Sequence, residues 1–426
     1  MKTTVKSVLG GLKQLNDEVL VPGDIVLTTA TAAVSKGVRL ITRSDISHAM
    51  VYVEDRSVID ATFEGVHARN TQRVFFEGHC SVHVLRLQTG ISDAQLNAVI
   101  TYLRGHIGTE YSIKEAMLTA IGGAHQWSKK QFCSRLVAQA FSSAGIQLVP
   151  DPNFCSPADL KESLFLSTVP NATLLVTAEE AVRWEGNEDV TQRMRDSINL
   201  VLRGARKKDK DIQTFDDLDR HLVNHPEQDD YFCRLLEKSG YLSVWKIEQE
   251  KNPWHYDLAR MSTLPTDQIE NYCWSVLQNE RGGPNRYIVN RGGYLLFFRQ
   301  YGLRFFGLME TLYEHLATLH RRRVDVAEMW LEDKGRFSRR VPLHLTPHTD
   351  EWFVALEQWD PPKAMMTRMV IEITGRTDVC SVCGDEPAND YFLAVEHQPT
   401  GGPNTLRLCD DCLHFRQTIG ESFVPL

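Results

Sequence analysis

The pattern of apolar and polar positions divides the first 170 residues into a strand-rich part and a helical part. Short apolar or alternating runs predict strands at residues 25–27, 47–53, 58–61 and 82–85. Apolar residues spaced three and four apart then predict helices at 92–103, 111–121, 128–144 and 156–160. Strands followed by helices indicate an α+β unit, a small antiparallel sheet with helices packed on it.

Two of these helices carry a capping signature. Ser92 with Gln95 forms a predicted capping box before the first helix, and Ser128 with Gln131 forms another before the third. Gly145 is placed to end the third helix. The third helix therefore has predicted boundaries at both ends.

The remainder of the chain has a different pattern. Long charged helices are predicted at 189–207 and 304–320, and the last segment is short and carries two cysteine pairs. A chain of 426 residues is also too long for a single core. We predict three domains: an α+β domain at residues 1–175, a mainly α domain of unknown role at 176–371, and a metal-binding module at 372–426.

Composition narrows the class of protein. The hydrophobic fraction of 42% and charged fraction of 24% are typical of a soluble globular chain. A net charge of −8 argues against a protein that coats nucleic acid, although basic runs at 203–210 and 321–323 keep that weaker alternative open. No apolar run is long enough for a transmembrane segment, and residues 1–20 lack the apolar core of a signal peptide. These features predict a cytoplasmic protein.

Cys133 is the first candidate for chemistry, because it lies near the start of the predicted third helix. Unpaired N–H groups and the helix dipole at that position favour a thiolate. The alternative is an inert core cysteine on the buried face of the helix, next to Leu136, Val137, Ala140 and Phe141. The helix alone does not separate the two interpretations.

A histidine and a carboxylate upstream favour the catalytic interpretation. His48 begins one predicted strand, and Asp60 lies near the end of the next, so an antiparallel hairpin would place them near each other. A cysteine hydrolase needs a thiolate, an imidazole and a polar group that orients the imidazole. The structural alternatives are a histidine at a strand start and an aspartate that caps a turn.

The order of these residues and their flanking sequences resembles the permuted papain-like amidases of the YaeF/YiiX kind, relatives of bacterial NlpC-type cell-wall peptidases and of lecithin retinol acyltransferase. The resemblance extends over residues 20–165, well under half of the chain. It rests on Gly23-Asp-Ile-Val-Leu27, Ser47-His-Ala49, Val58-Ile-Asp-Ala61 with Gly65-Val66, Tyr111-Ser112, Phe132-Cys-Ser-Arg-Leu-Val137 and Ser156-Pro-Ala-Asp-Leu160.

The resemblance implies a circularly permuted papain-like fold with Cys133 as nucleophile and His48 as base. Asp60 falls where the family usually has glutamate, which makes Glu64 a second candidate for orienting His48. The implied reaction is hydrolysis of an amide, ester or thioester acyl bond on a peptide, a lipid or a protein conjugate. Transfer of the acyl group to another acceptor by the same site is the alternative.

Four cysteines near the C-terminus predict a metal site. Cys380 and Cys383 form one CxxC pair, Cys409 and Cys412 form another, and 25 residues separate the pairs. Four thiolates at this spacing bind Zn²⁺ tetrahedrally and leave no open position, so we expect a structural zinc ion and no cofactor for the thiol chemistry. The helical and zinc-binding regions are candidates for binding a protein partner.

The segment between the two pairs is weakly similar to treble-clef HNH nucleases. Glu396-His397, Gly401-Gly402 and Asn404 match that pattern, and His397 would activate water. The histidine expected directly after the last cysteine is replaced by Leu413, and His414 is one residue late. A metal-dependent nuclease or nucleic-acid-binding protein is therefore the rival hypothesis to the thiol hydrolase.

Overall fold

The computed structural model describes residues 11–29, 44–54, 56–120, 128–185, 189–281, 286–336, 344–394, 402–418 and 421–426. The chain divides into two compact units, Met1–His225 and Pro226–Leu426. The three domains expected from the sequence stay a prediction, because compactness does not show which segments fold independently.

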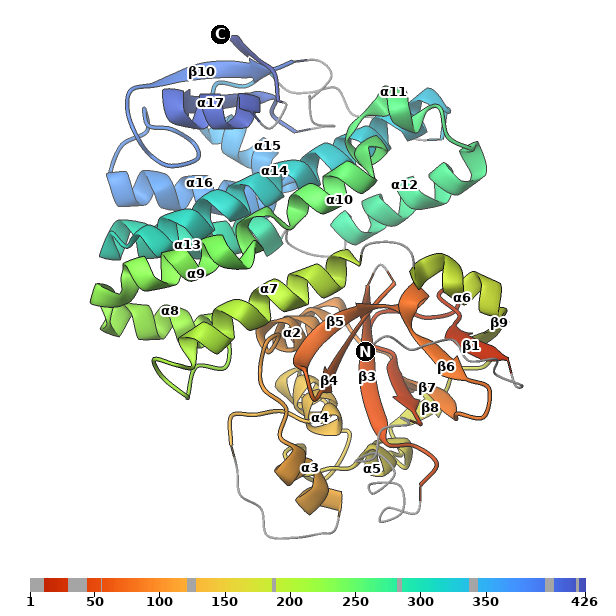
Figure 1. The fold of residues 1–426 in the computed structure, drawn as a ribbon. Helices are drawn as coiled ribbons and strands as arrows, with labels where there is room; N and C mark the ends of the chain where they lie inside the picture. Colours follow the sequence, from red (N-terminus) through yellow and green to blue (C-terminus); the bar gives the residue numbers. More distant parts are fainter. Residues whose placement is uncertain are drawn as a thin grey trace. The chain divides into compact units, whose positions relative to one another are not determined.

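A six-stranded antiparallel sheet is the framework of the first unit (Figure 1), with the strand order β5-β4-β3-β2-β7-β8. A second, three-stranded sheet has the order β6-β1-β9. The strands of both sheets are β1 (Leu12–Leu15), β2 (Ile25–Thr28), β3 (His48–Glu54), β4 (Ser57–Thr62), β5 (Gly65–Asn70), β6 (Phe75–Glu77), β7 (Val82–Leu87), β8 (Leu166–Thr168) and β9 (Thr173–Val176).

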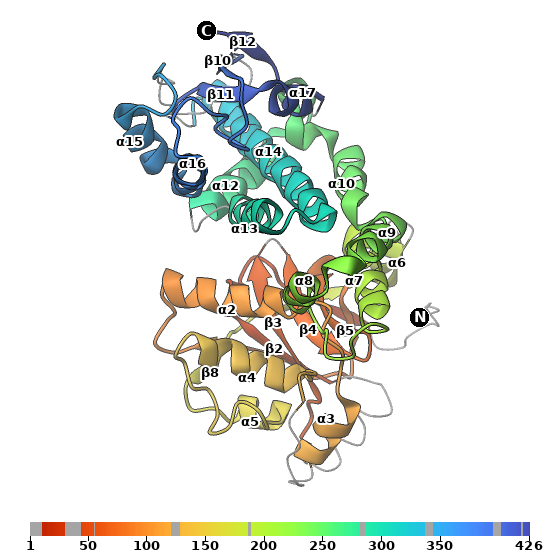
Figure 2. The same ribbon diagram turned by 90° about the vertical axis from the view of Figure 1, so that its left-hand side faces the viewer.

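Helices cover one face of the large sheet. The helices α2 (Asp93–Gly105) and α4 (Cys133–Ser143) lie together over the strands, with α5 (Pro157–Lys161) beside α4 (Figure 2). Val51 and Ile59 of the sheet, Leu103 of α2 and Val137 of α4 belong to one buried apolar cluster. Alternate strand residues such as Met50 face a second cluster on the other side. The short helix α3 (Ile113–Ala120) precedes α4.

The helix boundaries confirm one capping box and correct the other. Ser92 and Gln95 form the predicted box at α2, whereas α4 begins at Cys133 with Phe132 as its N-cap. Residue Gln131 is extended, since its N–H donates to the carbonyl of Glu110 at 2.9 Å and its carbonyl accepts the N–H of Ser112 at 2.8 Å. This pairing prevents the expected helical start at residue 128.

The first unit also includes the helices α6 (Ala178–Glu185), α7 (Val190–Ala205) and α8 (Phe215–Asn224). The guanidinium of Arg206, which follows α7, donates to the carbonyl of Gly108 at 2.7 Å. Arg195 of α7 forms an ion pair with Glu64 at 3.0 Å. These contacts attach α7 to the strand and loop region below it.

The second unit consists of helices and a small antiparallel sheet with the order β11-β10-β12. Its longest helix is α14, 30 residues from Arg304 to Asp333. The other helices are α9 (Asp229–Ser239), α10 (Trp245–Lys251), α11 (Leu258–Met261), α12 (Thr266–Arg281), α13 (Arg286–Tyr301), α15 (Asp350–Trp359), α16 (Pro361–Thr374) and α17 (Asp410–Thr418), and the strands are β10 (Ala388–Leu393), β11 (Thr405–Cys409) and β12 (Phe423–Pro425).

Within the described part of the chain, we find no helix that combines the length and the apolar character needed to cross a membrane.

Candidate active site

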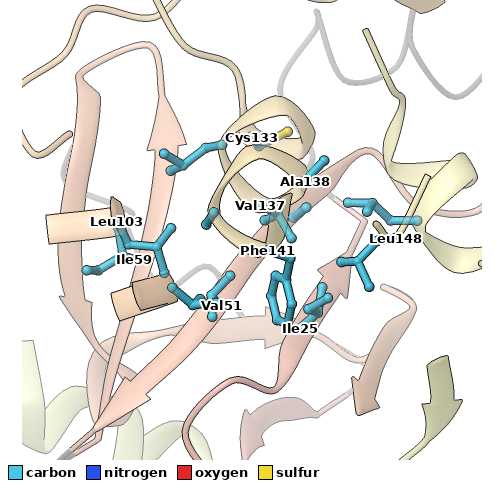
Figure 3. Packing of buried hydrophobic residues seen from close by; sticks show 14 of the residues in the cluster. Ile25, Val51, Ile59, Leu103, Cys133, Val137, Ala138, Phe141 and Leu148 are labelled. Carbon is cyan, nitrogen blue, oxygen red and sulfur yellow. The ribbon is translucent and has the colours of Figure 1, made fainter. Parts of the chain in front are cut away.

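Cys133 is the first residue of α4, and its side chain is almost fully buried. No side chain caps this helix start, so the first-turn N–H groups are not satisfied by a cap. Figure 3 shows Cys133 at the end of the helix, while Val137 and Phe141 point toward strand residues such as Ile25. The apolar face predicted for this helix is therefore confirmed as core, and the thiol lies at its N-terminal end.

His48, the first residue of β3, connects the thiol to a carboxylate. Its Nε2 lies 2.8 Å from Oδ2 of Asp60. In the β3–β4 ladder Asp60 pairs with Met50, so His48 is its diagonal neighbour on the same face. The imidazole also interacts with the side chain of Cys133 through a hydrogen bond. The structure thus brings together the three residues that the sequence predicted for this site.

The electrostatics of the site favour a charged imidazole. Burial alone would lower the pKa of His48, but the hydrogen bonds and negative charges of Asp60 and Cys133 outweigh burial and raise this pKa to about 10. An imidazolium at neutral pH is the natural partner of a thiolate. The arrangement therefore favours an imidazolium at His48 beside the sulfur of Cys133.

Asp60 is fully buried, and two residues of β5 help to keep it ionised. Burial would raise the pKa of the Asp60 carboxyl, but the charges of Arg69 and His67 and the hydrogen bond to His48 hold it well below its usual range. Arg69 Nη1 lies 3.2 Å from Oδ2, and His67 Nε2 lies 3.4 Å from Oδ1. His67 donates from Nδ1 to the carbonyl of Gly65 at 2.9 Å, which fixes its ring. Sequence reasoning missed both residues.

The β4–β5 register could have revealed these residues. Asp60 pairs with His67, and Val58 pairs with Arg69, so the hairpin that follows β4 carries a basic residue opposite Asp60 and another one position along the same face. The signal in the sequence is the alternation of His67 and Arg69 directly after the turn at Gly65.

Glu64, the second candidate for orienting His48, takes a different partner. Its carboxylate pairs with Arg195, and its side chain is 40% exposed. Tyr111, in contrast, lies within the electrostatic field of the site: burial and the negative charges of Cys133 and Asp60 raise the pKa of its phenol. Tyr111 is therefore a further polar residue near the site to which sequence reasoning gave no role.

The four predicted metal ligands form one cluster in the second unit. Their sulfur atoms all lie within 4.8 Å of one another, and Sγ of Cys383 lies 3.4 Å from Sγ of Cys409. The N–H of Asp385 donates to Cys383 Sγ at 3.4 Å, and the N–H of Val382 approaches Cys380 Sγ at 3.5 Å. Tetrahedral coordination with Zn–S bonds of about 2.3 Å requires sulfurs about 3.8 Å apart. The donor set and its spacing fit a divalent metal ion.

Only some of the residues proposed for nuclease chemistry belong to the described part of the chain. Glu396, His397 and Gly401 lie outside the described residues. Leu413 of α17 packs against the buried apolar cluster that includes Cys380 and Cys409. The nuclease hypothesis therefore remains a prediction from the sequence.

Comparison with known proteins identifies the class of the N-terminal domain. Residues 19–174 match the family model described as permuted papain-like amidase enzyme, YaeF/YiiX, C92 family. This part of the chain is therefore a papain-like domain of permuted order, and the resemblance seen in the sequence motifs is confirmed.

Two individual proteins are similar over the same region. The chain is 22% identical over 182 residues to the probable lipoprotein peptidase YaeF of Escherichia coli strain K12, a match covering 35% of this chain and 65% of that protein. The crystal structure of the metalloprotein yiiX from Escherichia coli O157:H7 shares 19% identity, covers 35% of this chain and 97% of that chain, and gives a TM-score of 0.28. The cytoplasmic location of the present chain stays a prediction.

Proposed function

We propose that the N-terminal domain is a cysteine hydrolase that cleaves an amide, ester or thioester acyl bond through Cys133, His48 and Asp60. The observation that carries the proposal is the double contact of the His48 ring. It hydrogen-bonds to the carboxylate of Asp60 at 2.8 Å on one side and to the thiol of Cys133 on the other. This is the arrangement that activates a nucleophile through an oriented base.

The first half of the reaction forms an acyl-enzyme. The thiolate of Cys133 attacks the acyl carbon, and the developing oxyanion accepts hydrogen bonds from N–H groups at the uncapped start of α4. His48 then donates its proton to the leaving amine, alcohol or thiol as the bond to the acyl carbon breaks. The product of this step is a thioester on Cys133 and a free leaving group.

The second half releases the acyl group. Neutral His48 accepts a proton from a water molecule that attacks the thioester, and it returns that proton to the departing Cys133 sulfur. Asp60 orients the ring and stabilises its charged form, while Arg69 keeps Asp60 ionised. If an acceptor alcohol or amine takes the place of water, the same steps transfer the acyl group.

The substrate that this chemistry requires is an acyl compound: a peptide, a lipid or a protein conjugate. The family description as an amidase supports an amide bond first. A protein partner recognised by the helical and zinc-binding regions would position such a conjugate.

We propose that the four-cysteine cluster binds Zn²⁺ through Cys380, Cys383, Cys409 and Cys412. Four protein ligands leave no coordination position for substrate, so the ion would supply a crosslink and not catalysis. The β10–β12 sheet is small, and a structural metal would stabilise it in place of a larger core.

An activity-based acyl probe with a thiol-reactive group tests the thiol chemistry. We expect one label on the full chain, mapped by mass spectrometry to Cys133, and its loss in Cys133→Ala. Cys155 is the matched control, because it is a buried thiol whose pKa burial raises. Labelling that persists in Cys133→Ala and disappears in Cys155→Ala would contradict the proposal. Product analysis with water or an added amine as acceptor distinguishes hydrolysis from transfer.

A further inference from the structure

The helix α7 lies against β5 of the first unit (Figure 2), although it follows residue 174, where the family match ends. Arg195 of α7 pairs with Glu64 at 3.0 Å, and Nδ2 of Asn199 donates to the carbonyl of Glu64 at 3.3 Å. These contacts hold the turn between β4 and β5. The helix therefore supports the hairpin that carries Asp60, and it does so from outside the family-matched part of the chain.

The start of β5 is fixed by a second set of contacts. The N–H of Val66 donates to the carbonyl of Thr109 at 2.9 Å, and the N–H of Gly108 donates to the carbonyl of Val66 at 2.9 Å. Gly65 has a φ of 97°, and a Cβ there would lie 2.7 Å from the carbonyl oxygen of Thr109. The backbone at Gly65 is therefore held closely against the neighbouring loop, and its carbonyl group has little freedom to move.

His67 on β5 lies between two hydrogen-bond acceptors. Its Nδ1 is 2.9 Å from the carbonyl oxygen of Gly65, and its Nε2 is 3.4 Å from Oδ1 of Asp60. A carbonyl oxygen only accepts, so Nδ1 carries a proton in this contact. The side chain of His67 is 3% exposed and that of Asp60 is fully buried, so water has little access to the pair.

The two carboxylate oxygens of Asp60 are satisfied unequally. Oδ2 lies 2.8 Å from Nε2 of His48 and accepts a hydrogen bond from Nη1 of Arg69 at 3.2 Å. Among the residues that the structure describes, none donates a hydrogen bond to Oδ1. The polar atom that faces Oδ1 is Nε2 of His67, at an ion-pair distance.

The protonation state of His67 decides whether this contact attracts or repels. A neutral ring with its proton on Nδ1 turns the lone pair of Nε2 toward the carboxylate oxygen, so two buried acceptors meet without a proton. An imidazolium carries protons on both nitrogens, and it can therefore donate to Gly65 and to Asp60 at the same time. The pair is satisfied only when His67 has taken up one proton from solvent.

The charges around His67 set the pH at which it takes up this proton. Burial lowers the pKa of His67, whereas the charge of Asp60 and the carbonyl of Gly65 raise it. The positive charges of Arg195 and Arg69 lower this pKa, and the net shift is downward from 6.5. The other titratable groups around the pair are Glu64, which pairs with Arg195, and the site residues His48, Cys133 and Tyr111.

We propose that His67 is a positioning residue for Asp60 and that α7 regulates the thiol site through it. As an imidazolium, His67 donates from Nε2 to Oδ1 and fixes the second oxygen of the carboxylate whose first oxygen orients His48. Arg195 opposes uptake of this proton, so a change at α7 alters how firmly Asp60 is held. The inference rests on the proposed function, because the position of Asp60 affects the reaction only if His48 is its base.

A ¹⁵N NMR titration of the histidine rings in the full chain tests the protonation of His67 without any substrate, with His67→Gln to assign the signal. We expect a ring protonated on Nδ1 at high pH, and uptake of a proton at Nε2 as the pH falls through a pKa below 6.5. Arg195→Met should move this transition to higher pH, because it removes a cation near the ring. Arg203→Met, at an exposed position of the same helix, is the matched control and should leave the transition in place. A ring protonated on Nε2 at high pH, or a transition that Arg195→Met does not move, would overturn the proposal.

The pH profile of kcat/KM for an acyl substrate tests the positioning role. Wild type should gain up to about tenfold as the pH falls through the pKa of His67, because Asp60 gains one hydrogen bond from a charged donor. His67→Gln keeps an amide donor and should retain most of the acid-side activity without the pH step. His67→Phe keeps a ring without a donor and should stay at the lower level at every pH.

The two measurements separate the two proposals. Equal pH profiles for folded His67→Gln and His67→Phe would overturn the positioning role of His67 while leaving the thiol chemistry intact. If the chain turns over no acyl substrate, the proposed function fails, and the NMR titration still decides whether His67 takes up its proton under the control of Arg195.

Discussion

The two cysteine-containing sites hold their thiols in opposite ways. In the four-cysteine cluster, the sulfurs lie within 4.8 Å of one another; Cys380 and Cys383 come from a turn, whereas Cys409 ends β11 and Cys412 lies in α17. At Cys133 one thiol meets an imidazole from β3, and both lie at the edge of a large buried core. Thiolates in the four-cysteine cluster need an added metal ion to neutralise their charge. At Cys133, the imidazolium of His48 supplies the positive charge. The comparison teaches that the proposed metal ion would be part of the fold in one unit, whereas in the other unit the thiol of Cys133 belongs to a buried apolar core made by the chain itself.

The largest effect is expected from removing the metal. Cys409→Ser, or a strong chelator, should unfold the β10–β12 module, because structural zinc contributes roughly 10–16 kcal/mol to such modules. Thermal unfolding and elemental analysis of bound zinc would measure this. Cys233→Ala, a buried thiol outside the cluster, should retain the zinc. If Cys409→Ser also abolished probe labelling of Cys133, the independence of the two sites would be refuted.

The second expected effect is on catalysis. His48→Ala and Asp60→Asn should each lower kcat/KM for an acyl substrate by about 10²–10⁴-fold, because the base is lost or no longer oriented. Glu64→Gln is the control, since Glu64 pairs with Arg195 and should keep full activity. Equal losses in Asp60→Asn and Glu64→Gln would point to a general effect on the fold. Circular dichroism of each variant distinguishes that outcome.

Buried ion pairs attach the metal module to α14, and breaking one gives the third effect. Arg416 of α17 contacts Glu314 at 2.8 Å and Glu421 at 2.7 Å, and Arg416 and Glu314 are buried. Arg416→Met should destabilise the second unit by about 3–5 kcal/mol, because Glu421 loses its cation and the buried Glu314 keeps only its pair with Arg291. Arg260→Met, which breaks an exposed pair with Asp257, should change the melting temperature little. Chemical denaturation of the full chain measures both.

The smallest effect is a pH dependence that links Cys133 to His48. The pKa of His48 rises from 6.5 to about 10 in the folded chain, so the stability it contributes is fully present below about pH 6.5. That stability is lost as the pH rises toward 10. Cys133→Ala should lower this pKa, because it removes one of the two groups that favour the imidazolium. An NMR titration of the His48 ring measures the shift, and an unchanged pKa would show that the thiol and the ring do not interact.

Local patterns in the sequence predicted the elements that depend on near neighbours. The Ser92–Gln95 capping box and the apolar face of α4 follow from spacings of three and four residues, which the helix itself imposes. The four-cysteine cluster was predictable for a similar reason, since the two cysteines of each CxxC pair are only three residues apart. The start of α4 was not predictable locally, because the bridge between Gln131 and the segment at 110–112 overrode the capping signal of Ser128.

The sequence by itself predicted the residues of the proposed thiol site, Cys133 and His48 with Asp60 or Glu64, from their order and their flanking motifs. The tertiary structure decided how these residues are supported. The strand register places Asp60 diagonal to His48 and opposite His67, and Arg195 of α7 pairs with Glu64. Contacts of this kind join segments far apart in the chain, and they follow from packing of the whole core. The alternation of His67 and Arg69 is a local signal, but the contacts of Arg69 with Asp60 and of Tyr111 with the site became visible only in the folded chain.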